Sequence, residues 1–165
     1  MQIGSTVTLT YKGTLEDGSV FGYADADKPM IFQTGMEQAI DGFEKAILEM
    51  NEEGEKRTFT VGMYDAYGEY RDDFTDKIPV EALAMGVKPG KRIWIWGENG
   101  EKLPCTVIAV DDKFVTIDQN HPLAGHDLTF EVEILKIEDA PEGFVSEADR
   151  RKERERLTGM LSNGF

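Results

Sequence analysis

The sequence predicts an α+β protein: an antiparallel sheet wrapped on a short helix, interrupted by a small mostly-β inserted domain and followed by a helical tail. Residues 6–12 and 128–137 alternate apolar and polar side chains, with the period of two that is typical of half-buried strands. Residues 36–51 instead carry apolar side chains at helical spacing. The sequence becomes polar and acidic after Tyr70. Residues 120–138 then look like the second half of the β-domain that ends near Tyr70, so one β-domain is interrupted by another domain.

The first domain is expected to consist of short strands around the helix. Apolar side chains alternate with threonine and lysine in residues 6–12, and the Glu16-Asp17-Gly18 sequence that follows is typical of a turn. The cleaner alternation near residue 130 indicates a closing strand of the same sheet. The expected strands are residues 6–12, 30–33, 55–61 and 128–137, with Phe59 and Val61 on one face of the third.

The helix expected at residues 36–51 has a single apolar stripe. Gly54 lies just beyond its end, where a left-handed cap favours glycine. The stripe consists of Ile40, Phe43, Ile47 and Met50, at positions i, i+3, i+7 and i+10.

The region after Tyr70 is expected to fold as a separate, mostly-β unit. Pro79 can start a short helix through Leu83. The Asn99-Gly100 pair is a hairpin signal, and Asp111-Asp112 is a second turn. A meander of three strands is expected at residues 91–96, 103–110 and 114–118. So small a unit is marginal alone, and a host domain that anchors both of its ends should stabilise it.

The chain is therefore divided into three parts. The first domain takes residues 1–71 and 119–140, the insert takes residues 72–118, and residues 141–165 form a charged tail. Ser146 and Asp149 have the spacing of a capping pair, which predicts a helix in the tail. Its mixed charge is typical of a solvated helix, and a contact with a partner is the alternative.

Composition narrows the functional classes. A net charge of −14 repels phosphate backbones, so nucleic acid is not expected as a partner, although acidity also serves solubility alone. No apolar run has the length of a membrane span, and the N-terminal MQIGSTVTLT lacks the features of a signal peptide. The single Cys105 excludes an internal disulfide. We expect a cytoplasmic protein, a monomer, with no membrane partner.

Four stretches resemble, in order, the FKBP-type peptidyl-prolyl cis/trans isomerases. The break after DAYGEY and the return at NHPLAGHDL resemble the branch of that family in which an insert-in-flap chaperone domain replaces a loop. The resemblance covers residues 1–140. The matching stretches are LTYKGTLEDGSVF (residues 9–21), GMEQAIDGFEKAILEM (residues 35–50), DAYG (residues 65–68) and LTFEVEILKIE (residues 128–138).

The resemblance implies an aromatic cavity that binds an X–Pro bond. In it, the backbone N–H of Ile40 and the hydroxyl of Tyr67 would donate hydrogen bonds, Phe43 would form the floor and Phe130 the far wall. Spacing alone allows Tyr11, Phe43 and Phe130 to be core residues only. The implied catalytic positions are Tyr11, Phe21, Ile40, Phe43, Tyr67 and Phe130, with substrate contacts from Met30, Ala39, Ala66, His121 and Leu123.

The insert carries a second set of candidate binding residues. In KRIWIW, alternation puts Ile93 and Ile95 on one face and Trp94 and Trp96 on the other. One face packs within the small unit, and an exposed apolar face would bind unfolded chains; a core and sheet cover is the equal alternative. The candidates are Leu83, Met85, Ile93, Trp94 and Trp96.

No metal or cofactor is expected. His121 and His126 are five residues apart, but no thiolate or carboxylate cluster accompanies them, and the tail after Glu138 has neither histidine nor cysteine. Gly22 stands where many relatives have aspartate, and Asp25 has the wrong spacing to replace it, so binding of macrolide inhibitors is left open while isomerase activity does not depend on this carboxylate.

Two functions are compatible with these features. The first is a prolyl isomerase that acts on unfolded or nascent polypeptides with X–Pro bonds, with the insert capturing the chain. The alternative is a holdase-type chaperone that kept the fold without the activity. The presence of Tyr11, Phe21, Ile40, Tyr67 and Phe130 favours the enzyme.

Overall fold

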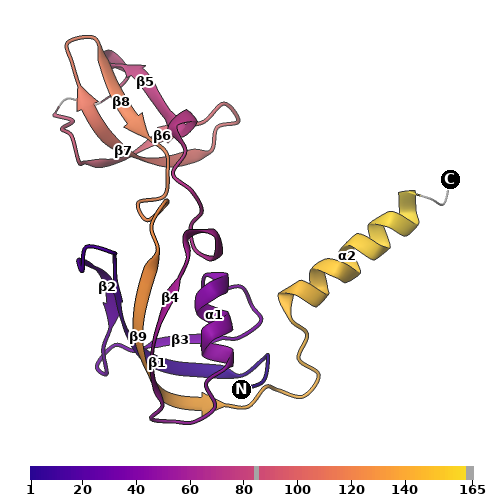
Figure 1. Ribbon diagram of the computed structural model, residues 1–165. Coiled ribbons are helices and arrows are strands. Elements are labelled where there is room, and N and C mark those ends of the chain that lie inside the picture. Colours follow the sequence, from indigo (N-terminus) through magenta and orange to yellow (C-terminus); the bar gives the residue numbers. More distant parts are fainter. Residues whose placement is uncertain (84–85, 163–165) are drawn as a thin grey trace. The chain divides into compact units, whose positions relative to one another are not determined.

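The computed structural model describes residues 1–83 and 86–162, which form two compact units. The first unit contains Met1–Gly68 and His126–Phe165, and the second is Glu69–Gly125. The chain therefore leaves the first unit once and returns to it once (Figure 1). The second unit contains all of residues 72–118. Close to its ends, the Asn120 side chain accepts the N–H of Arg71 at 2.9 Å and donates to the Arg71 carbonyl at 2.8 Å.

The first unit is built on an antiparallel sheet, as an α+β fold requires. Its strand order is β2-β1-β9-β4, and β3 also pairs with β1. The long β9 lies in the middle, between β1 and β4, so the two halves of the interrupted domain are joined through its hydrogen bonds. The strands are β1 (Thr6–Thr14), β2 (Val20–Ala24), β3 (Met30–Gln33), β4 (Lys56–Val61) and β9 (Leu128–Glu138).

One face of this sheet forms the core with helix α1 (Asp41–Leu48). The predicted alternation in β1 and β9 is confirmed, because every second residue is buried at the start of each strand. α1 buries Phe43 and Ile47 of the predicted stripe. The fully buried side chains of this core include Val7, Leu9, Ile47, Met50, Leu128 and Ile134.

The helix is shorter than the sequence predicts. Residues 36–40 are not helical: Glu37 has a φ of 54°, and Ile40 is extended with a ψ of 146°. The side chain of Gln38 accepts the N–H of Gln33 at 2.8 Å, which holds this segment to the end of β3. Gly54 has the expected left-handed φ of 84°, but it closes the turn before β4 instead of capping the helix.

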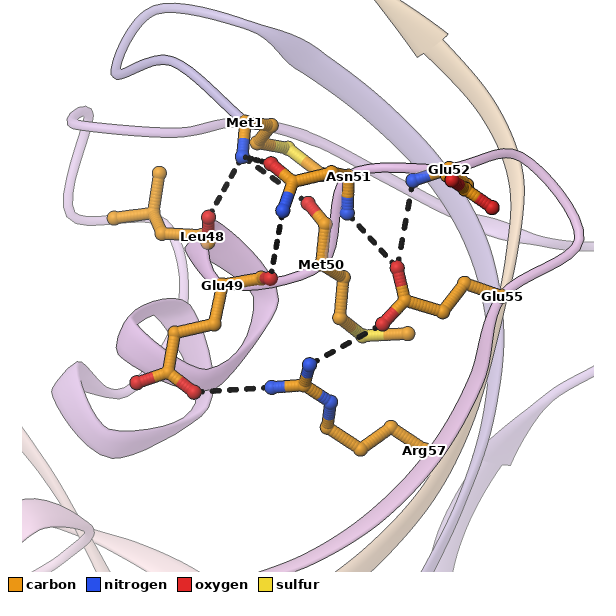
Figure 2. A network of polar contacts seen from close by, with 8 residues as sticks. All are labelled: Met1, Leu48, Glu49, Met50, Asn51, Glu52, Glu55 and Arg57. Atoms are coloured by element: carbon orange, nitrogen blue, oxygen red, sulfur yellow. Dashed lines mark hydrogen bonds and ion pairs between the residues drawn. The ribbon is translucent and has the colours of Figure 1, made fainter.

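Polar contacts tie the end of α1 to neighbouring segments (Figure 2). The amino group of Met1 donates to the carbonyls of Leu48 at 2.7 Å and Met50 at 3.1 Å, which supplies partners to the last turn. The guanidinium of Arg57 on β4 bridges Glu49 at 3.0 Å and Glu55 at 3.2 Å. These contacts therefore connect the C-terminal end of α1 to the N-terminus and to β4.

The second unit is a four-stranded antiparallel sheet with the order β5-β8-β7-β6. The sequence missed β5, because TDKIP contains a single inward apolar side chain, Ile78. The expected helix from Pro79 through Leu83 is a single 3₁₀ turn, Val80–Ala82. The strands are β5 (Thr75–Pro79), β6 (Arg92–Trp96), β7 (Lys102–Val110) and β8 (Phe114–Asp118).

The tail forms the predicted helix, α2 (Glu147–Ser162). Ser146 caps it: its hydroxyl accepts the N–H of Asp149 at 3.2 Å and donates to the Asp149 carboxylate at 2.7 Å. Among the helices in the described residues, none combines the length and the apolar character needed to cross a membrane.

Candidate active site

An aromatic cavity of about 380 Å³ opens in the first unit, between α1 and the sheet. Its wall combines residues from β1, β2, β3, β9, the segment before α1 and the segment after β4. Eight of the predicted site residues line it: Tyr11, Phe21, Met30, Ala39, Ile40, Phe43, Tyr67 and Phe130. Glu37, Gln38 and Leu128 complete the wall.

Phe130 is the centre of the aromatic cluster. Its ring centroid lies 4.9 Å from that of Phe43, 5.6 Å from that of Phe21 and 6.1 Å from that of Tyr11. All three ring pairs meet edge to face, the arrangement that the charge distribution of aromatic rings favours. Phe130 and Phe43 are only 5% and 3% exposed, so the floor of the cavity is dry protein interior.

Phe59 supports this floor from β4. Its ring centroid lies 5.7 Å from both Phe43 and Phe130. The alternation in residues 55–61 predicts Phe59 and Val61 on one face of the strand, but it does not indicate that Phe59 belongs to the site. Phe59 pairs with Phe130 across β4 and β9, so the signal that could have found it is the register of the two strands.

Phe21 reaches the cavity because Gly13 leaves space for its ring. Gly13 is paired with both Gly22 of β2 and Phe130 of β9. A Cβ at Gly13 would lie 2.3 Å from the end of the Phe21 ring, far inside van der Waals contact. The absent side chain therefore lets Phe21 lie across β1 and against Phe130.

The segment before α1 forms one wall. Ile40 is the N-cap residue, and its extended backbone places its N–H outside the helical hydrogen-bond ladder. Glu37 and Gln38 precede it and were missed by the sequence analysis. Both fall within the helix expected at residues 36–51 and outside its apolar stripe, so the helical pattern gave no signal for them, whereas the observed helix begins only at Asp41.

Tyr67 also lines the cavity, and it follows the 3₁₀ turn Met63–Asp65 after β4. Asp127, which precedes β9, accepts the N–H of Met63 at 2.9 Å and so holds this turn. Tyr67 is 40% exposed, as a residue at a cavity mouth must be. Ala66 is next to it in sequence but is not among the cavity-lining residues.

The chemistry of the cavity is apolar. Its described lining has one ionisable group besides the two tyrosines, the Glu37 carboxylate. Such a wall can desolvate a ligand and donate a few hydrogen bonds. Cys105, the single cysteine, lies in the other unit, where burial raises the pKa of its thiol.

A larger groove of about 850 Å³ is lined by residues of β1, β2, β4 and β9 and of the segment after β2. Its lining includes charged side chains, among them Lys12, Glu131 and the Lys56–Glu133 ion pair at 3.4 Å. Charged and hydrated walls do not provide a dry environment. Asp25 belongs to this groove, and its carboxylate accepts the N–H groups of Asp27 and Lys28 at 3.1 and 3.0 Å.

His121 and Leu123 belong to the second unit, so their place at the rim of the cavity stays a prediction. The Nδ1 atom of His121 accepts the N–H of Leu123 at 3.0 Å. Desolvation lowers the pKa of His121, and the nearby positive charge of Arg92 lowers it further.

The candidate binding residues of the insert lie on both faces of its sheet. Ile93 and Leu83 pack on the core of Cys105, Val107, Val115 and Ile117. Trp94 and Trp96 point away from that core and are 67% and 70% exposed. Met85 lies outside the described residues. Within those residues, no three histidine, cysteine, aspartate or glutamate side chains gather as a metal site.

The antiparallel sheet around one short helix, with an aromatic cavity between them, defines an FKBP-type protein. The family model described as FKBP-type peptidyl-prolyl cis-trans isomerase matches residues 1–135, and the chain belongs to this family. The predicted resemblance to this family is thereby confirmed, and several curated relatives with 34–36% identity are FKBP-type isomerases named SlyD.

Three relatives illustrate the similarity. An "FKBP-type peptidyl-prolyl cis-trans isomerase SlyD" of Vibrio cholerae is 34% identical over 86% of this chain and 71% of its own length. The SlyD of Escherichia coli K12 is 35% identical over 82% of this chain and 69% of its own length. A "Probable FKBP-type 16 kDa peptidyl-prolyl cis-trans isomerase" of Pseudomonas fluorescens is 34% identical over 79% of this chain and 87% of its own length.

Proposed function

We propose that the chain isomerises X–Pro bonds of polypeptides in the aromatic cavity centred on Phe130. As a member of the family, it is a peptidyl-prolyl cis/trans isomerase. The observation that carries the location is the cluster of aromatic rings from Tyr11, Phe21, Phe43 and Phe130 around one opening. A proline ring fits an apolar cavity of this size.

The reaction is difficult because the peptide bond has partial double-bond character. Rotation about it meets a barrier of about 18–20 kcal/mol, and the uncatalysed change takes tens to hundreds of seconds. When the C–N bond is twisted, resonance is lost and the amide is less polar than in either planar form. A dry cavity therefore disfavours the planar forms more than the twisted one, which lowers the barrier. A thousandfold acceleration requires only about 4 kcal/mol.

Two donors at the cavity support this mechanism. The N–H of Ile40 would donate to the substrate chain beside proline, and the Tyr67 hydroxyl would donate to a substrate carbonyl. The two donors come from different segments of the chain, one before α1 and one after β4, and together they would hold the substrate at two points. The substrate chain would then be held in a fixed orientation while the X–Pro bond rotates.

The second unit would hold the polypeptide. We assign residues 72–118 to an insert-in-flap chaperone domain that captures unfolded chains. Support comes from Trp94 and Trp96, exposed side by side along β6, since exposed aromatic side chains mark interaction sites. Weak capture would raise the concentration of an X–Pro segment near the cavity. A holdase without catalysis is not favoured, because the aromatic residues that catalysis needs line one cavity.

The test compares Phe130→Ala and Tyr67→Phe with wild type in a protease-free assay on short proline peptides. Tyr67→Phe should lower kcat/KM about fivefold, the effect of one hydrogen bond. Phe130→Ala should lower it more, because it opens the cavity to water, and should destabilise the fold by about 3–5 kcal/mol.

Two variants serve as matched controls. Val132→Ala removes a buried β9 side chain that does not line the aromatic cavity, and Tyr23→Phe removes an exposed hydroxyl that lines the larger groove. Both should retain wild-type kcat/KM. An unchanged kcat/KM in folded Phe130→Ala would place the activity elsewhere.

A further inference from the structure

The cavity wall before α1 contains a residue in an unusual backbone conformation. Glu37 has a φ of 54°, which L side chains rarely adopt, and it is not a glycine. The same residue lines the cavity, together with Gln38, Ala39 and Ile40. A conformation of this kind persists only where neighbouring groups hold it.

The beginning of α2 supplies such neighbours. The N–H of Glu147 donates to the carbonyl of Gly35 at 2.8 Å, two residues before Glu37. Gly35 packs so closely that an added Cβ would lie 3.3 Å from the Cβ of Ser146 and 2.6 Å from Ile3. On its other side, Gly35 donates its N–H to the Glu44 carboxylate of α1.

Arg151, one turn further along α2, holds Glu37 itself. Its Nη1 atom lies 2.9 Å from one carboxylate oxygen of Glu37 and 3.2 Å from the other. The two residues are 114 positions apart in the sequence, and both side chains are about half exposed. This pair thus connects the tail helix to the cavity wall.

We propose that Arg151 is a positioning residue for the isomerase reaction. It holds Glu37 in its left-handed conformation and neutralises the single carboxylate of the described cavity lining. The charge that the cavity presents to the substrate residue next to proline is therefore set from α2. This inference rests on the proposed function.

The selectivity between Lys-Pro and Glu-Pro peptides tests it. In Arg151→Gln, Glu37 is unpaired and attracts a lysine, so the ratio of kcat/KM for Lys-Pro over Glu-Pro should rise about two- to fivefold, the range for an exposed ion pair. This change in selectivity should arise from the KM values of the two peptides, with kcat little changed. Arg151→Lys keeps the charge and should restore most of the wild-type ratio.

Two comparisons distinguish the positioning of Glu37 by Arg151 from a general effect of removing a positive charge from α2. Arg154→Gln removes the same charge from the same helix, but Arg154 pairs with Glu147 at 2.8 Å and not with Glu37. It should leave the ratio near the wild-type value. In a Glu37→Gln background, Arg151→Gln should add no further change, because the interaction it removes is already absent. An equal effect of Arg154→Gln, or a full effect of Arg151→Gln in that background, would overturn the proposal.

Amide exchange provides a readout that needs no substrate. Exchange of residues 35–39 should be faster in Arg151→Gln than in wild type and Arg154→Gln, while exchange in β4 should not change. If Arg151→Gln exchanges faster but the wild-type chain does not isomerise proline peptides, the proposed function is overturned while the contact between Arg151 and Glu37 is supported. Unchanged exchange and selectivity in an active chain would overturn the role of Arg151 alone.

Discussion

At the scale of single residues, the shape of the cavity depends on Gly13, which has no side chain. The Phe21 ring occupies the space that a Cβ at Gly13 would need. Phe21 then meets Phe130 edge to face with an interplanar angle of 88°. One hydrogen atom in place of a methyl group thus decides the shape of one wall.

Gly13→Ala should therefore impair catalysis more than folding. The methyl group would displace Phe21 from Phe130 and open that wall to water. Because overpacking costs about 1–3 kcal/mol, the chain should still fold. Peptide isomerisation and thermal melting, measured on the same sample, would check this. Gly18→Ala is the control for alanine at a glycine of the nearby turn, where a Cβ meets nothing within 4 Å but φ is 82°. Full peptide activity in Gly13→Ala would show that the position of Phe21 is not important.

At the scale of elements, three segments meet where the interrupted domain is closed. The Glu16 carboxylate, in the turn between β1 and β2, accepts the N–H of Asp127 at 2.8 Å and contacts His126 at 3.1 Å. Asp127 in turn accepts the N–H of Met63. The residues that return from the second unit therefore hold the turn that precedes Tyr67.

This junction predicts an acid-sensitive contribution to stability. Hydrogen bonds from the backbone N–H groups of Glu16 and Asp127, and then the contact with His126, lower the pKa of Glu16. A lowered pKa means that the folded state prefers the ionised carboxylate. The stabilisation is present above the ordinary glutamate pKa of about 4.3 and is lost as pH falls through the lower folded value.

Glu16→Gln should consequently lower the melting temperature at pH 7, and the difference from wild type should shrink toward pH 3. Thermal unfolding followed at several pH values would measure it. Glu142→Gln, at an exposed position of the segment before α2, is a matched control. A difference that stays constant from pH 7 to pH 3 would contradict the role of the ionised carboxylate.

At the scale of the whole molecule, the chain folds as two compact units. Hydrogen bonds between Asn120 and Arg71 join the two chain segments that lead into and out of residues 72–118, so these segments are already held together. The second unit has its own core of Cys105, Val107, Val115 and Ile117. Its removal should thus leave the first unit folded.

Replacing residues 72–118 with a short glycine-serine linker should preserve activity on short peptides and reduce catalysis of protein refolding. Because capture raises the effective concentration, the loss with a protein substrate should be on the order of 100-fold. Proline-limited refolding of a reduced, unfolded substrate would measure it. The double variant Trp94→Ala, Trp96→Ala keeps the unit and should reproduce part of the loss. Equal losses with peptide and protein substrates would show that the insert is needed for the cavity itself.

The local sequence by itself determined the elements whose signals are periodic. The alternation in β1 and β9, the stripe of α1 and the Ser146 cap of α2 all depend on neighbours in sequence, so each was predicted from short segments. The resemblance then named eight of the residues that line the cavity, and their individual roles stay predictions.

Only the tertiary structure decided the features that depend on distant partners. The start of α1 at Asp41, the position of Glu37 and the strand β5 follow from contacts with β3, α2 and β8. The space for Phe21 exists because β1 and β2 pair in one register. Helical and strand periods report which side of a segment is buried. They contain no information about which remote group completes a hydrogen bond, an ion pair or a cavity wall.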